Sequence, residues 1–322
     1  MTKLEEMLDG VKSLVILGHV NPDGDCAGSC LAMYNYAEKY NPELYVKLYL
    51  QPVPEKFSYL KGYDRIKSEV CEEEPFDLCI CLDCSDRERL GEFGVYLESA
   101  AESLCIDHHV TNQGYAGENV IQGGASSTCE VLYGQLDGAL MDQDIAACLY
   151  TGIIHDTGVF RYSSTSARTM EIAGKLMETG IDFTGIIDDS FFKKTYLQSQ
   201  ILGRALMESI RFLDGRCIFT VVKKQDMTFY GVGPKDLDGI ADQLRTIDGV
   251  ECAIFMYETD NHMYKVSMRS NHVVDVSRIA SYFGGGGHVR AAGCTMSGSV
   301  HDVVNNLSGH IEKQMIREAA DV

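Results

Sequence analysis

The first half of the chain alternates apolar runs with helical patterns, and this alternation restricts the fold more than any other feature. The apolar runs have the length and composition of buried strands, and they lie at 13–19, 44–50, 76–83 and 103–109. The helical patterns lie at 26–40, near 127–137 and at 142–154. Because strands joined by helices pair in parallel, we predict an α/β domain with a parallel sheet and helices on both faces.

The second half of the chain reads as a smaller α/β domain. Its predicted strands lie at 216–222, 250–258 and 263–269, and its predicted helices at 235–246, 274–283 and 301–318. Residues 183–210 contain few helix breakers and are expected to be helical. We therefore predict an N-terminal domain over 1–186, a helical connector over 187–210 and a C-terminal domain over 211–322, with the active site in the cleft between the domains.

The distribution of charge along the chain limits the kinds of molecule that the protein can bind. Residues 1–204 hold 16 Lys and Arg against 32 Asp and Glu, a net of −16, while residues 205–322 hold 12 against 15, a net of −3. Nonspecific binding of long nucleic acid needs basic residues that release counterions, so such a partner is disfavoured. A small anionic substrate remains compatible with this charge if bound cations reverse its sign locally.

The N-terminal residues and the cysteines predict a cytoplasmic protein. No apolar run reaches the roughly 18 residues needed to span a bilayer, so no membrane association is expected. The first ten residues are acidic and lack the apolar core of an export signal. The twelve cysteines are therefore expected to be reduced thiols. Cys81 and Cys84 form a CxxC without a second pair, and we interpret them as apolar strand residues.

Four clusters of polar residues follow the predicted strands or end a helix. They are His19 with Asp23 and Asp25, then Asp83, then Asp107 with His108 and His109, and finally Asp156. Taken singly, each has a structural explanation, because aspartates commonly cap helices and form turns. Three of the clusters, however, stand where a parallel sheet brings the carboxyl ends of its strands together, and ligands bind at that edge in α/β proteins.

The charges of these residues favour a pair of metal ions. The carboxylates of Asp23, Asp25, Asp83 and Asp156 supply four negative charges, which two divalent cations would balance. Clustered carboxylates without cations would repel each other and shift their pKa values. His19 and His108 would act as neutral ligands. A mixture of oxygen and imidazole donors suits Mn²⁺, and Zn²⁺, Co²⁺ or iron could also bind.

The motifs together resemble the DHH phosphoesterase superfamily, which is named for the triplet at 107–109. The segments that match are HVNPDGD (19–25), LDCSD (82–86), IDHH (106–109), HDTG (155–158) and, near the C-terminus, GGGGHVRAAG (284–293). The last resembles the glycine-rich signature of the DHH-associated domain, so the N-terminal domain would be catalytic and the C-terminal domain would bind substrate. Length and motifs look most like the bacterial group of nanoRNases and 3′-phosphoadenosine 5′-phosphate phosphatases. Cys26 departs from the pattern, because many relatives have alanine there.

The resemblance implies a role for each residue of the clusters. One cation would be held by His19, Asp23 and Asp83, and the other by Asp25, Asp83, His108 and Asp156, so that Asp83 bridges the two. His109 would face the scissile phosphate. Asp107 would orient His108 as a hydrogen-bonding partner behind it.

The glycine-rich segment and a nearby arginine are the predicted substrate contacts. Gly285, Gly286 and Gly287 would let backbone N–H groups approach an anion, and Arg269 and His288 would grip a nucleotide phosphate or base. Without the resemblance, a flexible loop and a surface cation explain the same residues. Arg161 and Arg290 are left open as substrate contacts, and His155 is expected to pack or to cap a helix.

The predicted function is a two-metal phosphoesterase that hydrolyses short oligoribonucleotides, linear dinucleotides or 3′-phosphoadenosine 5′-phosphate. Two alternatives use the same site, namely an inorganic pyrophosphatase or exopolyphosphatase and a single-strand exonuclease. The pyrophosphatase branch carries a lysine-rich C-terminal signature that is lacking here. A processive exonuclease needs a basic groove, which the acidic composition of this chain disfavours. A nucleotide-sensing protein without activity is the third alternative, which the complete set of ligands disfavours. A homodimer is compatible with these predictions.

Overall fold

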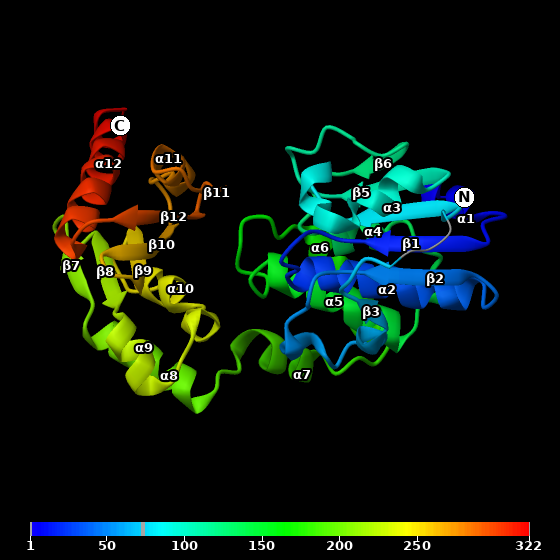
Figure 1. Ribbon diagram of the computed structural model, residues 1–322, viewed down its shortest axis with the longest axis horizontal. Helices are drawn as coiled ribbons and strands as arrows, with labels where there is room; N and C mark the ends of the chain where they lie inside the picture. Colours follow the sequence, from blue (N-terminus) through cyan, green and yellow to red (C-terminus); the bar gives the residue numbers. More distant parts are fainter. Residues whose placement is uncertain (1, 72–74, 322) are drawn as a thin grey trace. The chain divides into compact units, whose positions relative to one another are not determined.

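The computed structural model describes residues 2–71 and 75–321, which form two compact units (Figure 1). The first unit ends at Lys193 and the second begins at Lys194. Within the described ranges, no helix combines the length and the apolar character that crossing a bilayer requires.

A six-stranded parallel sheet forms the centre of the first unit. Its order is β3-β2-β1-β4-β5-β6, and every neighbouring pair is parallel. The strands are β1 (Ser13–Leu17), β2 (Tyr45–Tyr49), β3 (Ile66–Lys67), β4 (Leu78–Leu82), β5 (Glu102–Asp107) and β6 (Glu118–Ile121). The predicted α/β class with a parallel sheet is confirmed, because each crossover carries the chain back to the same end of the sheet.

The alternation of side chains along each strand supplies two apolar faces. Leu14 and Ile16 of β1 belong to one buried cluster, while Val15 and Leu17 belong to another on the opposite face. The helices are α1 (Lys3–Leu8), α2 (Gly24–Tyr40), α3 (Gly94–Ser99), α4 (Thr128–Tyr133), α5 (Gln143–Asp156), α6 (Ala167–Glu178) and α7 (Phe183–Ile187). Residues of α2, α4, α5 and α6 fill the first cluster, and α2 packs along α5 (Figure 1).

The second unit has a mixed six-stranded sheet in the order β11-β12-β10-β9-β8-β7. Only β8 and β9 pair in parallel; the other pairs are antiparallel. The strands are β7 (Ile210–Phe212), β8 (Cys217–Val222), β9 (Cys252–Asp260), β10 (Met263–Ser270), β11 (Gly286–His288) and β12 (Ala291–Ser297). The helices are α8 (Tyr196–Met207), α9 (Lys224–Tyr230), α10 (Ile240–Arg245), α11 (Val276–Tyr282) and α12 (Val300–Asp321). Helices α8 and α10 contribute to one apolar cluster, and α11 and α12 to the other.

The segment 183–210 is not one continuous helix. It consists of α7, a π-helical turn over Asp188–Phe192, and α8, which starts anew after Thr195. Thr195 ends the preceding extended stretch, because its hydroxyl accepts a hydrogen bond from the N–H of Gln198 and its own N–H donates to the side chain of Gln198. Thr195 and Gln198 have the spacing of a capping box, which marks the start of a helix.

The structure also contains elements that sequence periodicity did not predict. They include β6, α6, α9 and the hairpin that β11 forms with β12. The hairpin lies within the glycine-rich segment, where glycine weakens the pattern of alternating apolar residues that identifies a strand. Gly285 and Gly287 are required there, because a Cβ atom would lie 2.1 Å from the carbonyl oxygen of Gly293 and 2.5 Å from that of Ala291, respectively.

Glu251 is expected to be a main stabilising residue of the second unit. Its buried carboxylate accepts hydrogen bonds of 2.6–3.2 Å from the backbone N–H groups of residues 272–274. Glu251→Ala should lower the free energy of unfolding of this unit by about 2–4 kcal/mol, because it leaves these donors without an acceptor. Scanning calorimetry of the full chain would measure this, with the exposed Glu312→Ala as control. Equal melting temperatures for the two variants would contradict the prediction.

Candidate metal centre

The register of the first sheet brings the polar clusters to one edge. Leu17 of β1 is paired with Cys81 of β4, and Leu82 of β4 with Ile106 of β5. The chain leaves these three neighbouring strands at the same level, so His19, Asp83 and Asp107 follow each other along the carboxyl edge of the sheet. Asp83 has a φ of 57°, a left-handed conformation that aspartate tolerates better than most residues.

His19 is fully enclosed and its ring has a defined orientation. Its Nδ1 lies 2.9 Å from the carbonyl oxygen of Val20, which can only accept, so Nδ1 carries the proton. The other nitrogen, Nε2, lies 3.4 Å from Oδ2 of Asp83 and 3.7 Å from Oδ1 of Asp23. Nε2 therefore faces two carboxylates, and it is the nitrogen through which a neutral His19 would bind a cation.

His108 has the same relation to a second set of carboxylates. Its Nε2 lies 3.2 Å from Asp156, 3.7 Å from Asp83 and 3.9 Å from Asp25, while Nδ1 faces the carbonyl of Ala125. The ring is partly enclosed. Burial would lower its pKa, but the neighbouring Asp156 and the other carboxylates raise that pKa to about 10. Asp83 thus faces His19 with one oxygen and His108 with the other.

Asp25 is held by the start of a helix that is distant in sequence. Its carboxylate accepts hydrogen bonds from the N–H groups of Thr128 (2.6 Å) and Cys129 (3.0 Å), which begin α4. Unpaired N–H groups at a helix start favour a negative charge, so α4 stabilises this buried carboxylate. Gly152 of α5 leaves room for it, because a Cβ atom there would lie 2.6 Å from Oδ1 of Asp25.

Asp107 is placed differently from the expectation. Its Oδ1 lies 2.8 Å from Nδ1 of His109, whereas from His108 it accepts a hydrogen bond from the backbone N–H and not from the ring. In an extended chain, residues two apart point to the same side, so the ring of His109 meets Asp107 and the ring of His108 turns away. The prediction that Asp107 orients His108 is wrong. Asp107 orients His109 instead, and Asn112 donates to its second oxygen at 2.7 Å.

The electrostatics of the cluster fit divalent cations. Asp25 and Asp83 are buried, and their pKa values are raised first by burial and then by neighbouring carboxylates. The pKa of Asp156 rises to about 7 for the same reasons. For Asp23, the hydrogen bond and charge of His19 outweigh burial and lower its pKa to about 2. Like charges in such proximity are stable when a cation lies among them.

The donor atoms also lie at suitable separations. Ligand atoms of Asp25, His108 and Asp156 lie within 4.8 Å of one another, as do those of Asp83, His108 and His109. Oxygen and imidazole donors in this number are those that Mn²⁺ and similar ions accept. The residues present thus fit a metal centre, and a further group that includes His19 and Asp83 has the same spacing.

Two residues of the site were missed in the sequence. Thr128 donates from its hydroxyl to Oδ1 of Asp83 at 3.0 Å, and Asn112 holds Asp107. The start of a helix after Ser127 was a signal for Thr128, since N-terminal residues of helices commonly lie at ligand sites. For Asn112, which follows the triplet in an irregular loop, the sequence offers no comparable signal.

The predicted substrate contacts lie in the second compact unit. Arg269 donates from Nε to Asp242 at 3.0 Å, and His288 ends β11 on an exposed edge of the sheet. Arg290 donates to the carbonyl oxygens of His272 and Val274, so it holds a turn of its own unit. Arg161 is exposed in the first unit. His155 packs between Phe57 and Phe191, as expected, and contacts Ser190 at 3.0 Å.

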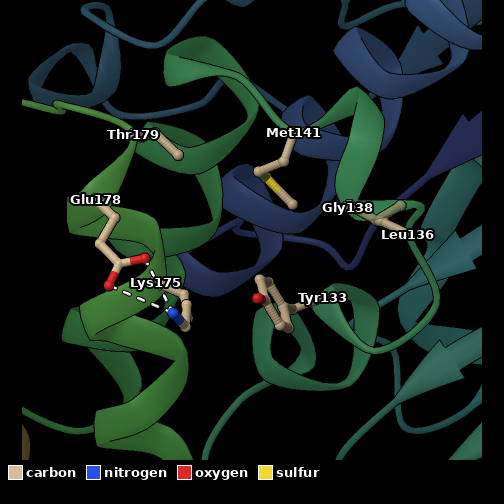
Figure 2. Close-up of a pocket in the computed structure, with 7 residues that line it drawn as sticks. All are labelled: Tyr133, Leu136, Gly138, Met141, Lys175, Glu178 and Thr179. Carbon is tan, nitrogen blue, oxygen red and sulfur yellow. Dashed lines mark hydrogen bonds and ion pairs between the residues drawn. The ribbon is translucent and has the colours of Figure 1, made fainter.

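A separate hollow of about 380 Å³ lies beside α4 and α6 (Figure 2). Lys175 and Glu178 form an ion pair at its wall. None of the predicted site residues is among the residues that line it, which are Tyr133, Leu136, Gly138, Met141, Lys175, Glu178 and Thr179. The hollow is therefore distinct from the metal centre.

Comparison with known families and proteins agrees with this arrangement. Residues 13–153 match the N-terminal domain of the DHH family, and residues 215–316 match the DHHA1 domain. The "bifunctional oligoribonuclease and PAP phosphatase NrnA" of Thermus thermophilus is 28% identical over 302 residues, covering 92% of this chain and 89% of the relative. The protein of the same name from Bacillus subtilis is 24% identical over 300 residues, covering 92% and 93%, respectively.

A solved structure shares the fold. It is an exopolyphosphatase-related protein from Bacteroides fragilis, 24% identical, with a TM-score of 0.87. The likeness covers 96% of this chain and 94% of that protein. With a sequence identity of 24%, this likeness supports the fold of the chain.

Gly152 offers a test of how α5 positions Asp25. Gly152→Ala should displace the Asp25 carboxylate. The affinity for metal should then fall at least about tenfold, because changes to groups that position metal ligands commonly lower metal affinity by that factor. Metal content after equilibrium dialysis would measure the effect. Gly174→Ala in α6 is the control, because a Cβ atom there meets nothing within 4 Å. This control should bind metal normally and gain slightly in stability; equal metal binding in both variants would disprove the role of Gly152.

Proposed function

We propose that this chain, which belongs to the DHH family of phosphoesterases, hydrolyses short oligoribonucleotides, linear dinucleotides and 3′-phosphoadenosine 5′-phosphate with two divalent cations, and that Mn²⁺ is the cation used. The observation that carries the proposal is the convergence of Asp25, Asp83 and Asp156 around His108 at the carboxyl edge of the sheet. Relatives named for oligoribonuclease and PAP phosphatase activity align along about nine-tenths of the chain, which supports the choice of substrate.

The residues divide into two ligand sets that share one aspartate. His19, Asp23 and Asp83 would hold one cation, and Asp25, Asp83, His108 and Asp156 would hold the other. The two oxygens of Asp83 face different histidines, which supports a bridging role. Thr128 fixes the Asp83 carboxylate through a hydrogen bond of 3.0 Å, and this restricts its rotation.

The chemistry is hydrolysis of a phosphoester by water. When bound, the cations would supply Lewis acidity that lowers the pKa of water and offsets charge on the phosphate. His109 would contact the phosphate through Nε2, since its Nδ1 is engaged by Asp107. Asp107 would keep the ring oriented, and Asn112 would keep Asp107 in place. A positively polarised N–H beside the phosphate would stabilise the charge that develops there.

The net charge of the first part of the chain supports a small substrate. A net charge of −16 over residues 1–204 disfavours a long polyanion that is not covered by cations. A substrate of one to a few nucleotides carries fewer phosphates outside the metal centre. A cytoplasmic location and a homodimer remain predictions.

The enzymatic alternatives use the same centre, so a panel of substrates distinguishes them. With Mn²⁺, 3′-phosphoadenosine 5′-phosphate, linear diadenylate and an RNA five-mer should be hydrolysed much faster than pyrophosphate or a long RNA. Asp83→Ala should abolish the rate and lower the metal content more than Asp23→Ala does, because it removes contacts on both sides of the cluster. Rates and metal content would be measured on the same samples. Preference for pyrophosphate, equal rates at all RNA lengths, or a nearly normal rate in Asp83→Ala would refute the proposal.

The second unit is proposed to contribute to nucleotide binding through its glycine-rich hairpin. Gly285 and Gly287 are explained by close approach of the backbone, but a Cβ atom on Gly286 would meet nothing within 4 Å. Open space at a glycine of an edge strand is suited to contact with a ligand. Arg269, which Asp242 holds by Nε, and His288 would contact the same nucleotide.

Gly286→Ala separates ligand binding from folding. This variant should fold normally and lower kcat/KM on nucleotides by about tenfold or more, because the methyl group would obstruct the bound nucleotide. Its matched control is Gly285→Ala, which should destabilise the unit, since its Cβ atom would clash with the backbone of Gly293. Steady-state kinetics and melting temperatures would be measured for both. An unchanged kcat/KM in a folded Gly286→Ala would rule out a nucleotide at this strand.

A further inference from the structure

A thiol lies inside the His19 half of the metal centre. The sulfur of Cys26, a ring nitrogen of His19 and a carboxylate oxygen of Asp83 lie within 4.8 Å of one another, and all three residues are buried. Two ligands of one cation are separated by about 3–4.5 Å when metal–ligand bonds are about 2.0–2.3 Å long. The sulfur is therefore close enough to share an ion with the other two.

The imidazole of His19 points to a ligand independently of the thiol. It is 3% exposed, and Nδ1 is occupied by the carbonyl of Val20. Its Nε2 faces the oxygens of Asp83 and Asp23, and in the neutral imidazole this nitrogen offers a metal-binding lone pair in that direction. A cation among these acceptors satisfies all of them at once, and the thiol group adjoins the same space.

The fold directs the sulfur to this position. Cys26 lies in the first turn of α2, directly after Asp25, and its N–H donates to Asp23 at 3.1 Å. Gly18, at the end of β1, leaves room for the side chain, because a Cβ atom there would lie 2.4 Å from the sulfur.

We propose that Cys26 is a ligand of the cation held by His19 and Asp83, so that the two cation positions of this chain differ in chemistry. This proposal rests on the metal centre of the proposed function. As the metal–sulfur bond forms, the thiol releases its proton to solvent. A thiolate raises the relative affinity of this position for Zn²⁺, Co²⁺ or Fe²⁺, whereas the set of Asp25, His108 and Asp156 has only oxygen and nitrogen donors and suits Mn²⁺.

Cobalt provides a spectroscopic test that does not depend on catalysis. Metal-free protein would be titrated with Co²⁺, with bound cobalt measured by mass spectrometry. The intact chain should develop a sulfur-to-cobalt charge-transfer band in the near ultraviolet, and Cys26→Ala should lose it while still binding cobalt through the remaining ligands. In Cys26→Ala, the ratio of the affinity for Zn²⁺ to the affinity for Mn²⁺ should also fall at least about tenfold.

Two control variants address the other thiols. Cys30→Ala removes a buried sulfur one turn further along α2, and Cys71→Ala removes the exposed thiol. Both should keep the band. X-ray absorption of the cobalt-loaded intact chain should find a sulfur neighbour at about 2.3 Å, as for zinc thiolates, and needs no variant that must fold.

The outcomes separate the two proposals. Bound cobalt without a band, or a band that persists in Cys26→Ala, would show that Cys26 is not a ligand and would leave the metal centre intact. An intact chain that binds no cobalt or manganese would overturn the metal centre together with the thiolate. Loss of the band in Cys30→Ala but not in Cys26→Ala would transfer the role to the neighbouring thiol one turn along α2 and refute the assignment.

Discussion

Repulsion among buried carboxylates is the constraint around which the first unit is organised. Asp25 and Asp83 are withdrawn from water and face Asp156 across His108, an arrangement that burial and like charges both destabilise. The fold compensates with fixed dipoles, since the start of α4 donates two N–H groups to Asp25 and Thr128 donates to Asp83. Divalent cations supply the remaining compensation, and this links the stability of the centre to the binding of metal.

The close packing of helices against the sheet edge follows from the same constraint. Asp25 can reach the start of α4 because Gly28 and Gly152 let α2 and α5 approach; a Cβ atom on Gly28 would lie 2.5 Å from the carbonyl oxygen of Cys148. Gly18 makes room for the sulfur of Cys26 in a similar way. Small residues therefore surround the cluster at the points where larger side chains would displace a ligand, and the rigidity of the helices holds the ligands in place.

The second unit has a different physical organisation. Its stability comes from two apolar clusters on the faces of a mixed sheet, and Glu251, directly before β9, joins the start of this strand to the turn at 272–274. Its polar residues are largely engaged with their own unit, as Arg269 is with Asp242 and Arg290 with the carbonyl of Val274. Open space at Gly286 on the edge strand distinguishes the hairpin from these internal contacts.

The amino-acid sequence by itself determined the α/β class and the positions of His19, Asp83 and Asp107 at strand ends, because apolar runs and parallel pairing place those positions on one edge. Tertiary structure alone decided which imidazole Asp107 contacts, that α4 stabilises Asp25, and that the sulfur of Cys26 joins His19 and Asp83. It also decided that Arg269 is held by Asp242. These contacts depend on side-chain direction and on approach between segments up to about a hundred residues apart, neither of which local periodicity contains.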